Sequence, residues 1–117
     1  MASLCLLAED GTMADQWELG LEPLAVGRDA SADVIVEDLA LSRRHFMIVC
    51  EGEHYLLHDL DSQNGTWVDG KPARKEPTPL RHHDCIVAGR TLFLFNGQHG
   101  TPSTETEVDT GALAVPA

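Results

Sequence analysis

The chain has 117 residues, of which 43% are apolar, and this is enough to bury one hydrophobic core but not two. Its 19 acidic and 8 basic residues give a formal net charge of -11, which excludes binding to nucleic acid or to an anionic membrane through bulk charge. Any anion must therefore be bound by a local cluster of basic residues.

The three cysteines, Cys5, Cys50 and Cys85, all lie in apolar runs. An odd, sparse set of this kind favours small buried side chains over a disulfide framework. The first apolar run, Leu4–Ala8, is too short for a signal peptide or a membrane span. We therefore expect a cytoplasmic domain that makes no contact with a membrane.

Short apolar runs separated by turn residues follow one another along the chain. Most are rich in Val, Leu, Ile and Phe, which is typical of β-strands, and no window shows a sustained helical period. The runs are Leu4–Ala8, Trp17–Leu21, Leu24–Val26, Val34–Val36, Phe46–Cys50, Tyr55–Leu57, Thr66–Val68, Cys85–Ala88 and Thr91–Phe95.

Residue pairs that end in glycine separate several of these runs, and such pairs favour tight hairpin turns. They are Asp10–Gly11, Glu51–Gly52, Asn64–Gly65 and Asp69–Gly70. Many short strands with turns of this kind predict an all-β fold, a two-sheet β-sandwich of about eleven strands with Greek-key-like connections. The run Phe46–Cys50 is apolar throughout, which predicts a central strand covered on both faces.

The composition changes after Phe95. Residues 97–117 contain no Phe, Trp or Tyr and no Lys or Arg, and they are rich in Thr, Gly, Pro and acidic residues. This composition predicts a flexible, disordered tail, and residues 1–96 are expected to form the folded domain.

Three polar segments lie between apolar strands, where a rigid sandwich displays binding groups on its loops. They are Gly27-Arg28, Ser42-Arg43-Arg44-His45 and the stretch 59–66, which includes Asn64-Gly65-Thr66. This ordered set, followed by Trp67-Val68-Asp69-Gly70, resembles the motif of the forkhead-associated (FHA) family. The resemblance covers residues 24–95 and implies a domain that binds phosphothreonine in partner proteins.

The resemblance implies that Arg28, Ser42 and Arg43 bind the phosphate. A guanidinium offers a rigid fork of donors that fits a phosphate, and a loop serine can donate its hydroxyl. Taken alone, Arg28 is more typical of a surface arginine paired with Asp29 or Asp33, and Ser42 of a turn or capping hydroxyl.

The resemblance assigns Asn64 to the backbone of the bound peptide, with help from Gln63. An amide carries both donors and an acceptor, so it can hold an extended chain. Asn64 also reads as the tip of a hairpin, because Asn–Gly is a favoured turn pair. Gly27, His45, Gly65 and Thr66 are expected to support the site structurally, as the resemblance implies for His45.

Enzymatic activity is not expected. No serine or cysteine has an activated setting, and no glycine-rich phosphate loop precedes a helix. The cluster His82-His83-Asp84-Cys85 is more typical of a solvated loop than of a metal site, so we expect no metal and no cofactor. The alternative function is an FHA-like scaffold that binds unmodified protein surfaces.

The expected partner is a phosphothreonine-containing protein downstream of a Ser/Thr kinase, bound by a monomer. The tail adds a further hypothesis, because Thr104 and Thr106 lie in its acidic stretch. If a kinase modified either residue, the tail could compete for the site. An ordinary solubilising tail is the alternative.

Overall fold

The computed structural model describes residues 2–73 and 76–97, and every regular element in these ranges is a β-strand. The strands are β1 (Ala2–Leu7), β2 (Met13–Leu19), β3 (Leu24–Gly27), β4 (Val34–Ile35), β5 (Phe46–Glu51), β6 (His54–Asp59), β7 (Thr66–Val68), β8 (Lys71–Ala73), β9 (Thr78–Pro79), β10 (Cys85–Ala88) and β11 (Thr91–Asn96).

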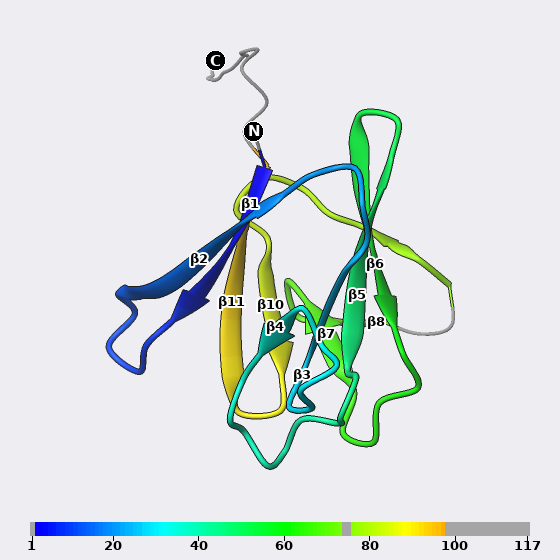
Figure 1. Ribbon diagram of the computed structural model, residues 1–117. Helices are drawn as coiled ribbons and strands as arrows, with labels where there is room; N and C mark the ends of the chain where they lie inside the picture. The colour runs from blue at the N-terminus through cyan, green and yellow to red at the C-terminus, as the bar shows by residue number, and fades with distance from the viewer. Residues whose placement is uncertain (1, 74–75, 98–117) are drawn as a thin grey trace.

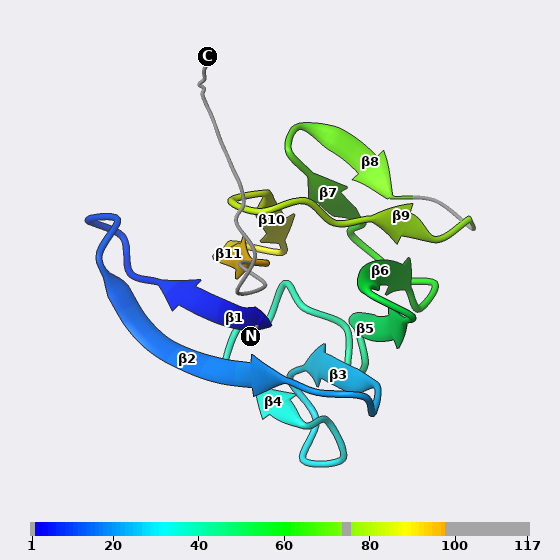
Figure 2. The same ribbon diagram turned by 90° about the horizontal axis from the view of Figure 1, so that it is seen from above.

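The strands form two sheets, which Figure 2 shows as separate layers when the molecule is seen from above. One sheet has six strands in the order β2-β1-β11-β10-β7-β8, and the other has five in the order β4-β3-β5-β6-β9. The chain crosses between the sheets after β2, β6, β8 and β9. The predicted all-β, two-sheet sandwich is therefore confirmed.

The core lies between the sheets and is built from alternate residues of each strand, because successive side chains point to opposite faces. Phe46 of β5 and Phe93 of β11 meet at its centre in an edge-to-face contact, with ring centroids 5.5 Å apart. The central position predicted for β5 is confirmed. The prediction that both of its faces are covered is wrong, since Met47 and Val49 are only half-buried.

Three of the four glycine turns close hairpins, between β1 and β2, β5 and β6, and β7 and β8. The fourth does not. Asn64–Gly65 lies in the connection from β6 to β7, and these strands belong to different sheets. The predicted hairpin at Asn64 is therefore wrong, because the chain crosses the sandwich at this point.

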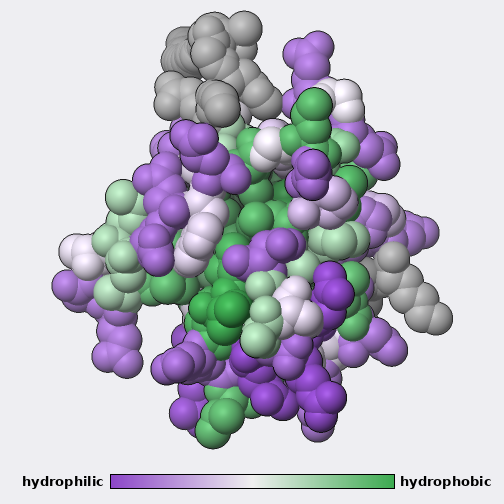
Figure 3. Space-filling model, in the orientation of Figure 1, coloured by the Kyte–Doolittle hydropathy of each residue, from purple (hydrophilic) through white to green (hydrophobic). Residues whose placement is uncertain are grey.

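Figure 1 shows how the connections are distributed. The loops between β3 and β4, β4 and β5, and β6 and β7 gather at the lower end, together with the turn between β10 and β11. The start of β1 and the end of β11 lie at the opposite end. Figure 3 shows a mostly hydrophilic surface at the loop end, with apolar surface gathered higher on the same face.

Candidate functional site

Gly27, the last residue of β3, allows two backbones to approach closely. A Cβ atom at this position would lie 2.0 Å from the carbonyl oxygen of Arg43 and 2.9 Å from the Cα of Arg44. Any residue other than glycine would therefore displace the β4–β5 loop. Hydrogen bonds from Arg28 N to Ser42 O (3.2 Å) and from Asp29 N to Arg43 O (3.1 Å) hold the two segments together.

Arg28 follows this contact, and its side chain is fixed at one atom. Its Nε donates to the carbonyl oxygen of Leu41 at 2.8 Å. The guanidinium is exposed to solvent, and its remaining donors belong to the two terminal nitrogens. The hydrogen bond to Leu41 thus orients a cationic fork beside the loop that carries Ser42.

His45 joins two loops from inside the protein and is 0% exposed. Its Nδ1 accepts a hydrogen bond from the backbone N–H of Ser42 at 2.9 Å, and its Nε2 lies 2.8 Å from the carbonyl oxygen of Gly65. Because Nδ1 must accept, the ring proton belongs to Nε2, which donates to Gly65. One neutral imidazole therefore sets the distance between the β4–β5 and β6–β7 loops.

Ser42 and Asn64 complete the connections between these loops. The Ser42 hydroxyl oxygen accepts from the backbone N–H of Gln63 at 3.0 Å, which leaves its own proton to be donated elsewhere. The Asn64 side-chain nitrogen donates to the carbonyl oxygen of Ala40 at 2.7 Å. A second N–H and the carbonyl oxygen of the same amide are then the groups that could meet a ligand. The Gln63 side chain is exposed beside them.

Asp59 organises the β6–β7 loop, a role that the residue pattern had not indicated. Its carboxylate accepts hydrogen bonds from the hydroxyls of Ser62 (2.5 Å) and Thr66 (2.7 Å), and from the Ser62 backbone (3.0 Å). Burial alone would raise the pKa of Asp59, but these hydrogen bonds outweigh it and hold the pKa below its ordinary value of 3.8. Thr66 itself is buried.

Ser62 continues this network, because its hydroxyl also accepts from the backbone N–H of Gly65 at 3.1 Å. Gly65 adopts a φ of 87°, a conformation that favours glycine. The spacing of Asp59 and Ser62, three residues apart, is the sequence signal that could have indicated these hydrogen bonds within the loop.

Arg43 is exposed at the edge of the loop cluster, near Asp29. The carboxylate of Asp29 accepts from the hydroxyl and backbone N–H of Ser31, and these bonds, followed by the charge of Arg43, lower the pKa of Asp29. Asp33 was the second acidic residue expected as a possible partner of Arg28. Its carboxylate instead accepts a hydrogen bond from the backbone N–H of Ala25 at 2.7 Å.

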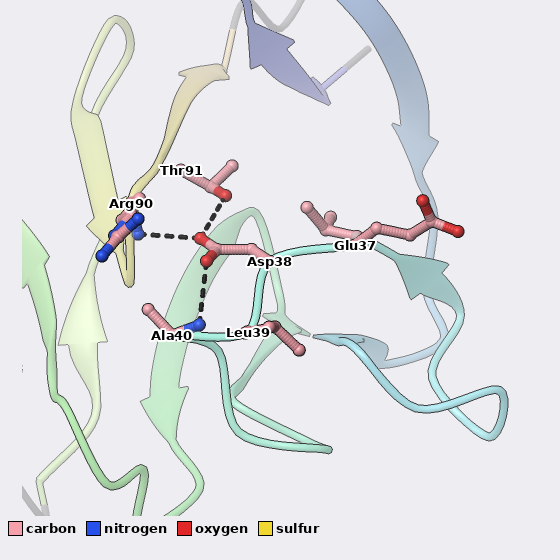
Figure 4. A pocket seen from close by; sticks show the side chains of 7 residues that line it. Glu37, Asp38, Leu39, Ala40, Arg90 and Thr91 are labelled. Carbon is pink, nitrogen blue, oxygen red and sulfur yellow. Dashed lines mark hydrogen bonds between the residues drawn. The ribbon is translucent and has the colours of Figure 1, made fainter.

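A pocket of about 590 Å³ opens beside these loops (Figure 4). It is lined by residues 36–40 together with Arg90 and Thr91. Asp38 joins the two sides of the pocket. Its carboxylate accepts hydrogen bonds from the backbone of Ala40 (2.9 Å) on one side, and from the backbone of Arg90 (2.8 Å) and the Thr91 hydroxyl (2.8 Å) on the other. Ala40 connects the pocket to Asn64, because its carbonyl oxygen accepts the Asn64 side chain.

The structure thus brings together Gly27, Arg28, Ser42, Arg43, His45, Gln63, Asn64, Gly65 and Thr66 at one end of the sandwich. The candidate phosphorylation sites Thr104 and Thr106 lie outside the described residues. Within residues 2–73 and 76–97, no three His, Cys, Asp or Glu side chains are arranged to hold a metal ion. The same ranges contain no helix with the length and hydropathy needed to cross a membrane.

The fold and this loop cluster define a class of protein, the β-sandwich domains that present polar side chains on loops at one end. The family model of the FHA domain matches residues 24–89, more than half of the chain. The chain belongs to the FHA family. FHA domains are phosphothreonine-dependent protein interaction modules.

Two solved structures share this fold. The FHA domain of FhaA, in complex with the intracellular domain of Rv3910, is 29% identical with a TM-score of 0.73, covering 82% of this chain and 100% of that one. An FHA domain studied for phosphothreonine-dependent interactions is 29% identical with a TM-score of 0.74, covering 86% of this chain and 98% of that one.

Two curated proteins are also similar. The oxoglutarate dehydrogenase inhibitor of Corynebacterium jeikeium is 29% identical over 94 residues, which make up 80% of this chain and 64% of that protein. The glycogen accumulation regulator GarA of Mycolicibacterium smegmatis is 30% identical over 71 residues, 61% of this chain and 44% of that protein. The chain therefore spans less than two thirds of the length of these relatives.

Proposed function

We propose that this FHA domain binds phosphothreonine in partner proteins through the loop end of the sandwich. Arg28, Ser42 and Arg43 hold the phosphate, and Gln63 and Asn64 hold the backbone of the peptide around it. The observation that carries the proposal is that these residues lie on three loops at one end of the sandwich. The loops are joined to one another by Arg28–Leu41, by His45, and by the Ser42–Gln63 and Asn64–Ala40 hydrogen bonds.

The phosphate is held by charge and geometry together. The terminal nitrogens of Arg28 and the side chain of Arg43 supply cationic donors, and the Ser42 hydroxyl supplies a neutral one. A hydrogen bond to a charged group contributes about 1.5–3 kcal/mol, so three or four of them support roughly micromolar affinity after the cost of ordering the peptide. The local cluster thus overcomes the repulsion expected from a net charge of -11.

The supporting residues act by keeping these groups in place before the ligand arrives. Gly27 lets the β4–β5 loop lie against β3, His45 joins that loop to the β6–β7 loop, and Gly65 and Thr66 fix the conformation of the latter. A loop ordered in advance loses less conformational entropy on binding, which strengthens the affinity of a small interface.

The wider role follows from this chemistry. The partner is a protein phosphorylated by a Ser/Thr kinase, bound by a monomeric domain in the cytoplasm. The domain itself catalyses no reaction and uses no cofactor or metal. Control of the bound partner therefore depends on the kinase and phosphatase that set its modification state.

Calorimetry with three synthetic peptides tests the proposal. A phosphothreonine peptide is expected to bind, whereas the unmodified and Glu-substituted versions are not, because a carboxylate has less charge and fewer acceptor oxygens than a phosphate. Arg28→Ala is expected to abolish binding with an unchanged circular dichroism spectrum. Arg81→Ala, at an exposed arginine outside the loop cluster, is the matched control. Near-normal affinity in a folded Arg28→Ala variant would contradict the assignment.

The alternative, a scaffold that binds unmodified protein, is not favoured. Such a scaffold has no need for two arginines, a serine and an asparagine on adjoining loops. Equal binding of the Glu-substituted and phosphorylated peptides would support the phosphate-independent scaffold.

A further inference from the structure

The outer face of the six-stranded sheet carries a row of apolar side chains that runs across all six strands. Residues directly opposite one another in antiparallel strands lie on the same face. The pairings Met13–Leu7, Leu7–Leu92, Leu92–Val87, Val87–Trp67 and Trp67–Pro72 connect β2, β1, β11, β10, β7 and β8 in turn. We name these six residues the outer row.

The outer row faces away from the core. Its neighbours along each strand, such as Phe93, Ile86 and Val68, are the buried residues that point inward. Met13 is 57% exposed and Trp67 is 39% exposed, while Leu7, Val87 and Leu92 are half-buried. Cys5, Leu94 and Cys85 form a second paired row beside it.

This arrangement differs from that of a sheet with one solvent-exposed face, in which the outward-pointing residues are polar. Strands about 4.8 Å apart make the outer row about 24 Å long, a continuous apolar strip rather than scattered single residues. Contiguous apolar surface of this kind marks interaction sites in soluble domains. Figure 2 shows the six strands curving together as one layer.

The outer row lies against the proposed phosphopeptide site at Trp67, the residue next to its end at Pro72. The ring of Trp67 covers Gly65, since a Cβ atom there would lie 3.0 Å from the Trp67 Cη2. Gly65 follows Asn64 and receives the His45 hydrogen bond. The row is therefore continuous with the loop that holds the peptide backbone.

We propose that the outer row binds an apolar segment of the same phosphothreonine ligand, so that the partner is held at two adjoining places. This inference rests on the proposed function. The loop end takes the phosphate, and the flanking segment turns past Trp67 and crosses Val87 and Leu92 towards Leu7 and Met13. The ligand class is a phosphothreonine protein with a hydrophobic stretch beside the modified residue.

The spacing defines where that stretch lies. Asn64 and Trp67 are three residues apart, so at most about 10 Å separates the held backbone from the start of the outer row. The row from Trp67 to Met13 extends for four strand spacings, about 19 Å. An extended ligand would thus place apolar residues roughly three to nine positions from the residue held by Asn64. A second copy of the chain is the less favoured occupant, because it brings the same net charge of -11.

The test uses a peptide library with a fixed phosphothreonine and random positions on each side, selected on the wild-type chain. The same selection is repeated on a Val87→Thr, Leu92→Thr double variant, because threonine favours strands but adds hydroxyls to the row. Neither residue belongs to the binding loops. Leu21→Thr is the matched control, because Leu21 is 84% exposed in the β2–β3 connection and outside the row.

We expect the wild-type chain to select Leu, Ile, Phe or Met at these flanking positions on one side of the phosphothreonine. The double variant should lose that selection and bind the selected peptide at least about tenfold more weakly. Its affinity for a short, polar phosphothreonine peptide should be unchanged, which also shows that it folds. If the double variant does not fold, Met13→Gln at the exposed end of the row replaces it.

Three results would overturn the proposal. The first is selection that depends on phosphothreonine but shows no apolar preference at these positions, and the second is a preference that survives in the double variant. The third is a wild-type dimer in sedimentation that the double variant dissociates, in which case a second copy covers the row. Absence of any phosphothreonine-dependent selection would be a different failure, that of the proposed function itself.

Discussion

Asn64–Gly65 and Asp69–Gly70 carry the same kind of turn sequence but adopt different structures. Asp69 and Gly70 both have positive φ values, 51° and 86°, and close the tight hairpin between β7 and β8. Asn64–Gly65 crosses from one sheet to the other, and only Gly65 has a positive φ. Outside its own hairpin, the first pair makes one backbone hydrogen bond, from Asp69 N to Cys85 O at 2.7 Å on the neighbouring strand. The second pair is held by His45, Ala40 and Ser62.

This difference shows that contacts between distant residues determine the conformation of the binding site. A hairpin turn is a local structure, determined by backbone preferences within four residues. The conformation of the β6–β7 loop depends on tertiary contacts, because its hydrogen-bond partners lie up to 24 residues away. Mutations that disturb distant partners should therefore affect binding, and mutations in the local turn should not.

The largest expected effect is that of Gly27→Ala. The added Cβ would overlap the carbonyl oxygen of Arg43, and neither backbone can move without breaking the contact between β3 and the β4–β5 loop. We expect a loss of more than about 4 kcal/mol of unfolding free energy, and no phosphopeptide binding, by urea titration and calorimetry. Gly20→Ala, where a Cβ meets nothing within 4 Å, is the control. Equal stability of the two variants would contradict the close approach.

His45→Ala comes second. It removes two hydrogen bonds and leaves a cavity at a buried position, which together cost about 3 kcal/mol. Binding should weaken along with the fall in melting temperature, because Ser42 and Gly65 lose their common partner. Loss of binding at unchanged stability would instead place His45 in contact with the ligand.

Asp59→Asn should cost about 2 kcal/mol at neutral pH, because an amide replaces a charged acceptor of three hydrogen bonds. The wild-type chain should also lose this stability in acid. The pKa of Asp59 is lower in the folded chain than its ordinary value of 3.8, so its contribution is complete above that value and disappears as the pH falls below it.

Thermal melting of both proteins from neutral pH into the acid range below the ordinary pKa of aspartate measures this contribution. The two curves should converge at the acidic end, since a protonated Asp59 accepts hydrogen bonds no better than the amide of the Asp59→Asn variant. A constant difference between the curves at every pH would show that Asp59 stabilises the loop independently of its charge.

The smallest effect is expected for Gly70→Ala. A φ of 86° is unfavourable for alanine and costs about 1 kcal/mol, while the added Cβ meets no neighbour within 4 Å. Phosphopeptide affinity should not change, because the hydrogen bond that this turn makes outside its hairpin goes to Cys85 and not to the binding loops. A fall in affinity comparable to that of His45→Ala would contradict the prediction, because it would show that the β7–β8 turn also supports the binding site.

Much of the fold could be predicted from the sequence because strand and turn signals are local. Nine apolar runs anticipated strands that the structure contains, and three glycine turns were placed correctly. The two remaining strands, β8 and β9, are short and each contains a proline, which suits the sheet edges where they lie but gives no apolar run to recognise.

The parts that could not be predicted depend on contacts between distant residues. Nothing within the sequence 59–66 indicates that the chain changes sheets there, or that the Asn64 side chain reaches the backbone of Ala40. The outer face of β5 was expected to be covered because Met47 and Val49 are apolar, yet apolar composition cannot distinguish a covered face from an exposed one. The roles of the phosphate-binding residues stay predictions until a ligand is bound.

The pairing of β1 with β11 has a mechanical consequence. Ser3 and Asn96 are directly opposite one another at the end far from the loops, and the ladder continues to Leu7 and Leu92. Tension applied between these two ends would load the pairs one after another, as in a zipper, rather than shear all of them at once. The domain should therefore open at low force, from Ser3–Asn96 towards Leu7–Leu92, and the binding loops lie outside this ladder.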